Sequence, residues 1–234
     1  MARENLKTRT ARAKRIMAQL KTAYPGAHCE LSYSNPLELL IATILSAQCS
    51  DRQVNIVTSD LFKKYRTADE FAGAPLAELE AAIRRIGLYR NKAKSIKAAC
   101  QTLLEKYGGE VPRTMEALTE LSGVGRKTAN VVLGNAFGIN EGVVVDTHVA
   151  RLSRRLGLSS QSAPEKIEQD LQKLTPRKDW TNLSHWLIWH GRRRCFARSP
   201  QCPECEIQAD CPAGQKVLNP KLTPEQQEKM RKRV

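Results

Sequence analysis

The segment from Leu118 to Ala150, LTELSGVGRKTANVVLGNAFGINEGVVVDTHVA, determines how the rest of the chain is interpreted. Its centre is Gly123–Lys127, where two glycines precede a helical pattern that runs to Phe137. Glycine adopts positive φ easily, and the start of a helix directs N–H groups and a positive dipole end outwards. Such a corner can bind a phosphate, but it can equally be a tight turn between two helices. It is not a dinucleotide-binding motif, since the third glycine and the preceding strand are absent.

Apolar residues recur at helical spacing through most of the chain. Capping signals precede several of these patterns, as at Asn35 and Thr67, and glycines follow others, as at Gly108. The only plausible strand, Val143–Val145, is too short to found a sheet. The sequence therefore predicts an all-α fold with about ten helices.

The chain is strongly basic. Its 234 residues include 38 Lys and Arg against 24 Asp and Glu, a net charge of +14. The excess is concentrated in the first 21 residues, in Arg192–Arg198 and at the C-terminus, and includes Arg3, Lys7, Arg9, Arg12, Lys14, Arg15 and Lys21. A polyanion partner fits this distribution, because neutralised phosphates release counterions; a solvated basic surface is the alternative. No apolar run approaches the ~18 residues of a membrane span, and no signal-peptide pattern begins the chain. We therefore expect an intracellular protein with no membrane partner.

Four of the seven cysteines form a C-x6-C-x2-C-x5-C pattern, comprising Cys195, Cys202, Cys205 and Cys211. Seven cysteines in a reducing compartment argue against a disulfide framework. Interleaved prolines favour a loop wrapped around a metal centre. Coordination chemistry leaves zinc and an iron–sulfur cluster both open.

The run LSGVGRKTANVVLGNAFG followed by VVVDTH, together with the cysteine spacing, resembles the endonuclease III family of DNA glycosylases. One departure is Ser122, where the family usually has proline. The resemblance extends from about Asn35 to Ala213, nearly the whole chain apart from its tails.

This resemblance implies two helical domains with a DNA cleft between them. One is a six-helix barrel over residues 29–138, with a helix–hairpin–helix at about 118–138. The other combines residues 1–28 and 139–234, and its cluster loop, 195–211, would hold a 4Fe–4S cluster. A structural role for the cluster, holding the Arg192–Arg198 loop against phosphates, is favoured over charge transport or damage sensing. We expect a monomer.

The resemblance also assigns the chemistry. Lys127 is the expected nucleophile, because an amine can form a Schiff base with the sugar. Asp146 is expected to stabilise positive charge at the sugar or to handle a proton, without keeping Lys127 protonated through a close ion pair. The structural alternatives are a lysine that only contacts phosphate and an aspartate that only caps a helix.

Further residues are expected to contact DNA. Gly123, Gly125 and Arg126 would bind a phosphate, and His148 would contact phosphate or support the site. Gln48, in the family's SAQ motif, and Leu88 would fill the gap left by an extruded nucleotide. Here Cys49-Ser50 replaces the family's usual Ala-Thr. Without the resemblance, a helix-end glutamine and a leucine packed inward would be the simpler interpretations.

The predicted function is a bifunctional glycosylase and abasic-site lyase acting on oxidised or ring-saturated pyrimidines in double-stranded DNA. A pyrimidine-dimer glycosylase on the same scaffold is the nearest alternative. An adenine-mismatch glycosylase fits less well, because such relatives generally lack this lysine and carry an additional domain. From other classes, a non-catalytic iron–sulfur DNA-binding protein and a zinc-binding regulator are the alternatives. A bacterial protein of this kind would be found with the nucleoid.

Overall fold

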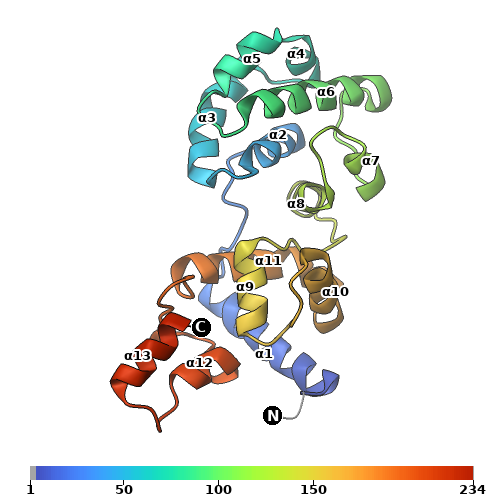
Figure 1. Cartoon of the computed structure of the whole chain (residues 1–234). Coiled ribbons are helices and arrows are strands. Elements are labelled where there is room, and N and C mark those ends of the chain that lie inside the picture. Colours follow the sequence, from blue (N-terminus) through green and yellow to red (C-terminus); the bar gives the residue numbers. More distant parts are fainter. Residues whose placement is uncertain (1–3, 234) are drawn as a thin grey trace. The chain divides into compact units, whose positions relative to one another are not determined.

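The computed structural model describes residues 4–233, and within that range it contains thirteen α-helices, three short 3-10 turns and no strand (Figure 1). The all-α prediction is confirmed, although the helices are more numerous than expected. Val143–Val145 is extended but does not pair with another strand. Instead, the backbone N–H of Val144 donates to Ser184 Oγ at 2.9 Å, on a helix that follows later in the chain.

The chain divides into two compact units. Residues Cys29–Glu141 form one, here called the hairpin unit. The residues through His28 and those from Gly142 onwards form the other, here called the cysteine unit. The resemblance predicts the second boundary after residue 138, whereas the chain divides after Glu141. The barrel and cluster-domain assignments remain predictions.

Seven helices make up the hairpin unit: α2 (Pro36–Ser46), α3 (Asp51–Lys64), α4 (Ala68–Gly73), α5 (Leu76–Ala82), α6 (Tyr89–Tyr107), α7 (Met115–Thr119) and α8 (Arg126–Phe137). Helix α2 is apolar on all sides and is buried from Leu39 to Leu45, because it packs against α3, α6 and α8. Helices α4 and α5 pack against the long α6 (Figure 1). A continuous hydrophobic core therefore holds α8 and the turn before it in place.

The predicted caps form, with one difference. Asn35 Oδ1 accepts the N–H of Glu38 at 2.9 Å, with Pro36 at the first helical position. The Glu38 carboxylate reaches one residue further back, to the N–H of Ser34 at 2.6 Å. At α4 the capping box between Thr67 and Glu70 is complete.

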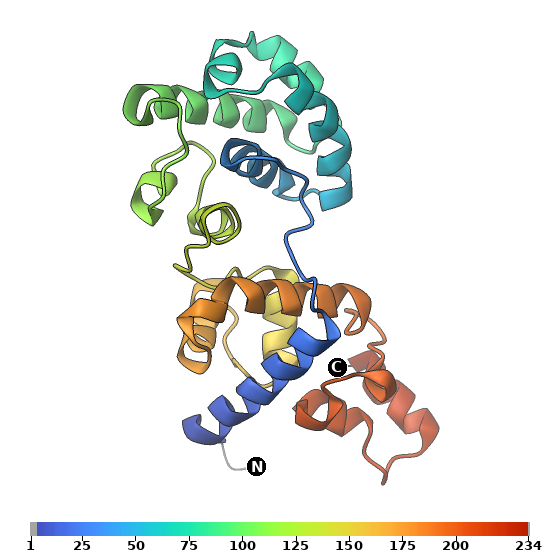
Figure 2. The same ribbon diagram turned by 180° about the vertical axis from the view of Figure 1, so that it is seen from behind.

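Six helices make up the described part of the cysteine unit: α1 (Leu6–Ala23), α9 (Thr147–Arg155), α10 (Pro164–Leu174), α11 (Trp180–Arg193), α12 (Pro212–Val217) and α13 (Pro224–Arg233). Helix α1 packs against α10 and α11 (Figure 2). Helices α9 and α11 cross closely at Gly191, where an added Cβ would lie 2.8 Å from His148 Nδ1. The cysteine loop between α11 and α12 contains two of the 3-10 turns, Cys202–Glu204 and Gln208–Asp210.

Two of the N-terminal basic residues stabilise this unit, which the charge pattern did not indicate. Arg12 is 9% exposed and donates to the carbonyls of Leu156, Gly157 and Asp210. Arg15 forms an ion pair with the Asp210 carboxylate at 2.6 Å. Arg3 lies outside the described residues. Within residues 4–233, no helix combines the length and apolar character that crossing a membrane requires.

Candidate active site

The turn before α8 requires glycine at only one of its two positions. Gly123 has a φ of 78°, and an added Cβ would lie 2.9 Å from Ser95 Cβ on α6. Both the left-handed backbone and the close packing exclude other residues there. The next residue, Val124, is buried, and its N–H donates to the carbonyl of Leu121 at 3.1 Å. The turn is therefore fixed to the core of the hairpin unit.

Gly125 does not use the freedom that glycine has to adopt a positive φ. Its φ is −96°, which any residue can adopt, and no atom lies within 4 Å of an added Cβ. Gly125 is the N-cap of α8, and no side chain caps this helix. What glycine provides here is open space in front of a helix N-terminus, which suits an approaching anion.

Lys127 and Arg126 both lie in the first turn of α8, and both side chains are exposed. The N–H of Ala129 donates to the carbonyl of Gly125 at 3.0 Å, so the helix is regular from its first turn. The Lys127 amine is therefore carried on a rigid element and is accessible to a large substrate.

Asp146 is the N-cap of α9 in the cysteine unit. Its Oδ1 accepts the N–H of Val149 at 2.8 Å, and the side chain is half-buried. The helix-cap interpretation from the sequence is therefore confirmed. It does not exclude a second role, because a carboxylate has further lone pairs with which to act.

His148 is the second residue of α9 and is half-buried against α11. Arg151 Nη2 lies 3.2 Å from His148 Nδ1 and also donates to the carbonyls of Gly191 and Cys195, each at 3.0 Å. Burial lowers the pKa of His148, and the charges of Arg151 and Arg192 lower it further, whereas the charge of Asp146 raises it. A neutral imidazole at pH 7 is a weak partner for phosphate, so the geometry favours support of the α9–α11 crossing.

Gln48 and Leu88 are exposed, and both have left-handed backbones, with φ of 55° and 58°. For residues other than glycine this conformation costs about 1–3 kcal/mol and is enriched at functional sites. The Leu88 side chain is 58% exposed, so the simpler interpretation of a leucine packed inward is wrong. Both protrude from the hairpin unit, which is what a residue filling a gap in DNA requires.

The four spaced cysteines line one pocket, beside His190 and Arg155. None of them forms a disulfide. Three of the four sulfurs have a nitrogen neighbour: Arg155 Nη1 lies 3.2 Å from Cys195 Sγ, the Gly214 N–H 3.2 Å from Cys211 Sγ, and His190 Nε2 3.5 Å from Cys205 Sγ. Hydrogen bonds to sulfur of this kind tune metal–thiolate centres.

The protonation of the cysteines bears on whether this pocket holds a metal. Burial raises the pKa of Cys202 to about 11 and that of Cys205 to about 12, so both thiols would be protonated unless a metal took the place of the proton. In a tetrahedral zinc site, Zn–S bonds of ~2.3 Å place the sulfurs about 3.8 Å apart. Within residues 4–233, the ligand atoms that come within 4.8 Å of one another belong to His190, Cys205 and Glu206, not to three of the four cysteines. The four cysteines, which line one pocket, could therefore hold a metal.

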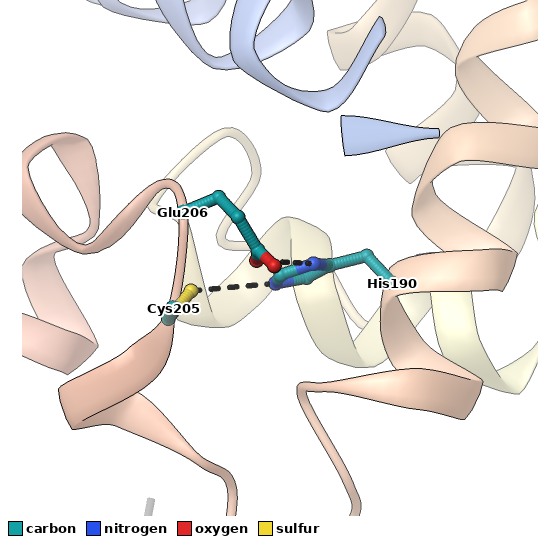
Figure 3. Close-up of side chains that lie close together, drawn as sticks. All are labelled: His190, Cys205 and Glu206. Carbon is teal, nitrogen blue, oxygen red and sulfur yellow. Dashed lines mark hydrogen bonds and ion pairs between the residues drawn. The ribbon is translucent and has the colours of Figure 1, made fainter. Parts of the chain in front are cut away.

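The His190–Cys205–Glu206 group was not predicted from the sequence (Figure 3). His190 is 1% exposed, and its Nδ1 lies 3.0 Å from Tyr24 Oη and 3.8 Å from the Glu206 carboxylate. Burial lowers the pKa of His190 to about 4, so the imidazole is neutral at pH 7. No sequence signal marks this group, because His190 lies on α11 whereas Cys205 and Glu206 lie in the cysteine loop.

Arg194 also differs from the expectation that the Arg192–Arg198 segment faces phosphates. Its guanidinium lies 2.9 Å from Glu204 and 3.2 Å from Glu206, both within the cysteine loop. At least one arginine of the segment therefore stabilises the loop.

Residues 41–177 match the HhH-GPD superfamily of base excision DNA repair proteins. Endonuclease III of Synechocystis sp. is 53% identical over 204 residues, which are 87% of this chain and 93% of the relative. The chain belongs to the endonuclease III family. The Bacillus subtilis enzyme is 48% identical over 194 residues, covering 82% of this chain and 88% of the relative.

Among solved structures, a trapped endonuclease III–DNA covalent intermediate superposes with a TM-score of 0.84 and 47% identity. The alignment covers 90% of this chain and 99% of that one. A thermostable thymine-DNA glycosylase, 23% identical with a TM-score of 0.80, shows the same fold. The superfamily match ends before the cysteine loop, whereas the similarity to endonuclease III extends over most of the chain.

Proposed function

We propose that this member of the endonuclease III family is a bifunctional enzyme of base excision repair. It removes oxidised or ring-saturated pyrimidines from double-stranded DNA and cleaves the strand 3′ to the resulting abasic site. The observation that carries the proposal is the exposed Lys127 amine on the first turn of α8, beside the open space at Gly125. The related endonuclease III that was trapped as a covalent intermediate with DNA supports it.

In the proposed reaction, the Lys127 amine attacks C1′ of the damaged nucleotide. The bond between C1′ and the base breaks, and the base leaves with a proton. The C1′–O4′ bond then opens, O4′ takes up a proton, and a protonated Schiff base remains between C1′ and the lysine nitrogen. Removal of a C2′ proton then breaks the C3′–O bond, and the 3′ phosphate leaves with the electron pair. Water hydrolyses the imine, which releases the strand end and restores the amine.

Asp146 would act on the same nucleotide as a carboxylate that stabilises positive charge at the sugar or relays a proton. Its N-cap bond to Val149 fixes the orientation of the side chain. Asp146→Asn tests this role, because asparagine caps a helix as well as aspartate does. We expect unchanged stability and base release slowed by roughly 10²–10⁴-fold. Equal loss of stability and activity would indicate that Asp146 only caps the helix.

Gly123, Gly125 and Arg126 would bind a phosphate of the damaged strand, and Gln48 and Leu88 would fill the gap left by the extruded nucleotide. The protein would act as a monomer on DNA inside the cell. The pocket that distinguishes a ring-saturated pyrimidine from a pyrimidine dimer is a separate question, because both substrates would use Lys127 and Asp146.

Cys195, Cys202, Cys205 and Cys211 would hold a 4Fe–4S cluster. The cluster would supply four metal–thiolate bonds that close the cysteine loop, and it would take no part in bond breaking. Arg155 and Arg194, which donate to this loop, would hold it in the shape that the cluster needs. Iron and sulfide analysis and visible absorption test this proposal, and a colourless, iron-free protein that binds zinc would contradict it.

Borohydride trapping tests the enzyme proposal. The wild-type chain should form a covalent adduct with a duplex that carries an abasic site or thymine glycol, and Lys127→Gln should form none. Lys127→Arg is the matched control, since it keeps the positive charge for phosphate but cannot form the imine. It should bind DNA like the wild type and also fail to trap. An adduct with Lys127→Gln would show that another amine is the nucleophile.

A panel of duplexes separates the alternatives. It should contain thymine glycol, dihydrouracil, a pyrimidine dimer, adenine opposite oxidised guanine, and a bare abasic site. Cleavage of the first two and of the abasic site is expected. Cleavage of the dimer alone would favour the alternative glycosylase, and tight binding without cleavage of any duplex would favour a non-catalytic DNA-binding protein.

A further inference from the structure

Lys92, on the first turn of α6, is an unusual residue in the hairpin unit. It is 6% exposed, although lysine is almost never buried without partners. Its Nζ donates to the carbonyl of Leu45 at 2.9 Å and to that of Ala47 at 2.5 Å. These carbonyls lie at the C-terminal end of α2, where the helix leaves its last carbonyls without backbone partners and its dipole is negative. The amine is therefore well placed to satisfy them.

The same residue is bonded to both loops that carry the exposed left-handed residues. The backbone N–H of Lys92 donates to the carbonyl of Leu88 at 3.1 Å, and its side chain holds the residues just before Gln48. The two loops are adjacent, since a Cβ on Gly87 would lie 4.0 Å from the Gln48 carbonyl oxygen. Lys92 thus connects the loop of Gln48 with the loop of Leu88.

Both loops need such support. Gln48 and Leu88 have φ of 55° and 58°, a conformation that non-glycine residues keep only when the surrounding structure enforces it. Both side chains are exposed, so their own packing does not enforce it. The Cys49 N–H donates to the Ser46 carbonyl at 3.0 Å. This bond closes the loop of Gln48 but does not connect it with the loop of Leu88.

We infer that Lys92 is a positioning residue that fixes Gln48 and Leu88 relative to each other, so that both enter DNA together when a nucleotide is extruded. This inference rests on the proposed function, in which these two side chains fill the gap. Lys92 touches neither DNA nor the reacting atoms. It acts by holding two strained turns in the one arrangement that suits the interrupted base stack.

Helix α6 offers a matched control in Lys97. Its Nζ donates to the carbonyls of Ala72 and Ala74, the latter at 2.7 Å, at the C-terminal end of α4. Lys97 therefore makes the same kind of contact, from the same helix, at a place that carries no exposed left-handed residue. Lys92→Met and Lys97→Met each keep an unbranched side chain that is one atom shorter and remove the three donors of the ammonium group.

The experiment uses the full chain and a duplex in which 2-aminopurine lies beside a tetrahydrofuran abasic analogue. The fluorescence of 2-aminopurine rises when the base stack around it is disrupted. We expect Lys92→Met to reduce the fluorescence rise and to lower kcat/KM on duplex abasic DNA about tenfold, the scale of a small misplacement. Its cleavage of an abasic site in a single strand, which needs less extrusion, should change little. Lys97→Met should resemble the wild type in all three measurements.

Equal losses in Lys92→Met and Lys97→Met, or equal losses on duplex and single strand, would overturn the inference in favour of general destabilisation. An unchanged fluorescence rise in Lys92→Met would also overturn it. Should Lys92→Met not fold, Lys92→Gln, which keeps donors on a shorter side chain, is tested in the same way. The fluorescence requires no bond breaking, so it reports on Lys92 even if the trapping experiment shows that Lys127 is not the nucleophile.

Discussion

The hairpin unit and the cysteine unit are both helical, but different interactions hold them together. In the hairpin unit, α2 is buried on all sides within a continuous apolar core, and the buried charged residue is Lys92. The cysteine unit instead buries Arg12, Arg155, Glu168, His190 and Asp210. Both arginines donate to carbonyls of the cysteine loop, and Arg155 also donates to a cysteine sulfur. The hairpin unit should therefore be stable without metal, whereas the cysteine unit should depend on it.

Replacing one of the proposed cluster ligands should have the largest effect and should separate the two units. We expect Cys205→Ser to abolish iron binding and to cost the cysteine unit more than about 4 kcal/mol, because metal binding contributes directly to folding. Amide hydrogen exchange of the full chain should show loss of protection in α11 and α12, with protection retained in α2 and α6. The control is Cys100→Ala, which changes a cysteine in the core of the hairpin unit. This variant should bind as much iron as the wild type. Equal loss of protection in both units would contradict the comparison.

Removing a buried arginine should have the next largest effect. Arg155 is 9% exposed and donates to Cys195 Sγ at 3.2 Å and to the carbonyls of Phe196 and Ala197 at 2.6 and 2.9 Å. Arg155→Met leaves these acceptors without a partner, so we expect a loss of about 3 kcal/mol and faster release of iron to a chelator. Arg154→Met changes the exposed neighbour and should alter neither quantity. Similar iron release from both variants would show that the guanidinium is not needed at the loop.

In the hairpin unit, the two glycines before α8 should respond in opposite ways. Gly123→Ala introduces a Cβ 2.9 Å from Ser95 at a φ of 78°, and we expect it to cost about 2 kcal/mol with or without iron. Gly125→Ala has open space and a φ of −96°, so its free energy of unfolding should stay within about 0.5 kcal/mol of the wild type. Denaturant unfolding measures both.

The same pair distinguishes stability from binding. A methyl group at Gly125 occupies the space in front of α8, so Gly125→Ala should weaken binding to an abasic duplex about tenfold while leaving the fold intact. If Gly125→Ala bound DNA like the wild type, the anion site would have to be placed elsewhere on the hairpin unit. A loss of stability in Gly125→Ala would mean that residue 125 does not have an extended backbone in the folded protein.

The sequence predicted the features that depend on local patterns. Helical periodicity gave the all-α fold, and side-chain caps at Asn35 and Thr67 were predicted from short motifs that act within one turn. The cysteine spacing predicted a metal site because four thiols in one loop must come close together. The family resemblance gave the order of Lys127, Asp146 and the cysteines, which no periodicity contains.

Features that depend on contacts between distant segments were missed. Arg12 and Arg15 were interpreted as surface charge, because their partners, Leu156 and Asp210, come from the other end of the chain. The group around His190 needs α1, α11 and the cysteine loop to be packed first. At Gly125 the sequence shows that a glycine is present but not which of its properties is used, and its φ is in fact negative.

The smallest predicted effect concerns the start of α1 and depends on pH. Glu4 forms an ion pair with Arg12 at 2.7 Å, and the hydrogen bond from Arg12 is the main reason that the pKa of Glu4 is lowered from 4.5. A carboxyl whose pKa is lower in the folded state stabilises the protein above its unfolded pKa, and this contribution disappears as the pH falls through the folded value. Glu4 is partly exposed and screened, so Glu4→Gln should cost only about 0.5 kcal/mol at pH 7 and nothing at strongly acid pH.

The control for this prediction is Glu225→Gln, which removes an exposed ion pair with Lys229 on α13. Urea unfolding across this pH range should show the difference between wild type and Glu4→Gln shrinking with acid; a difference that is independent of pH would mean that Glu4 acts through packing rather than charge.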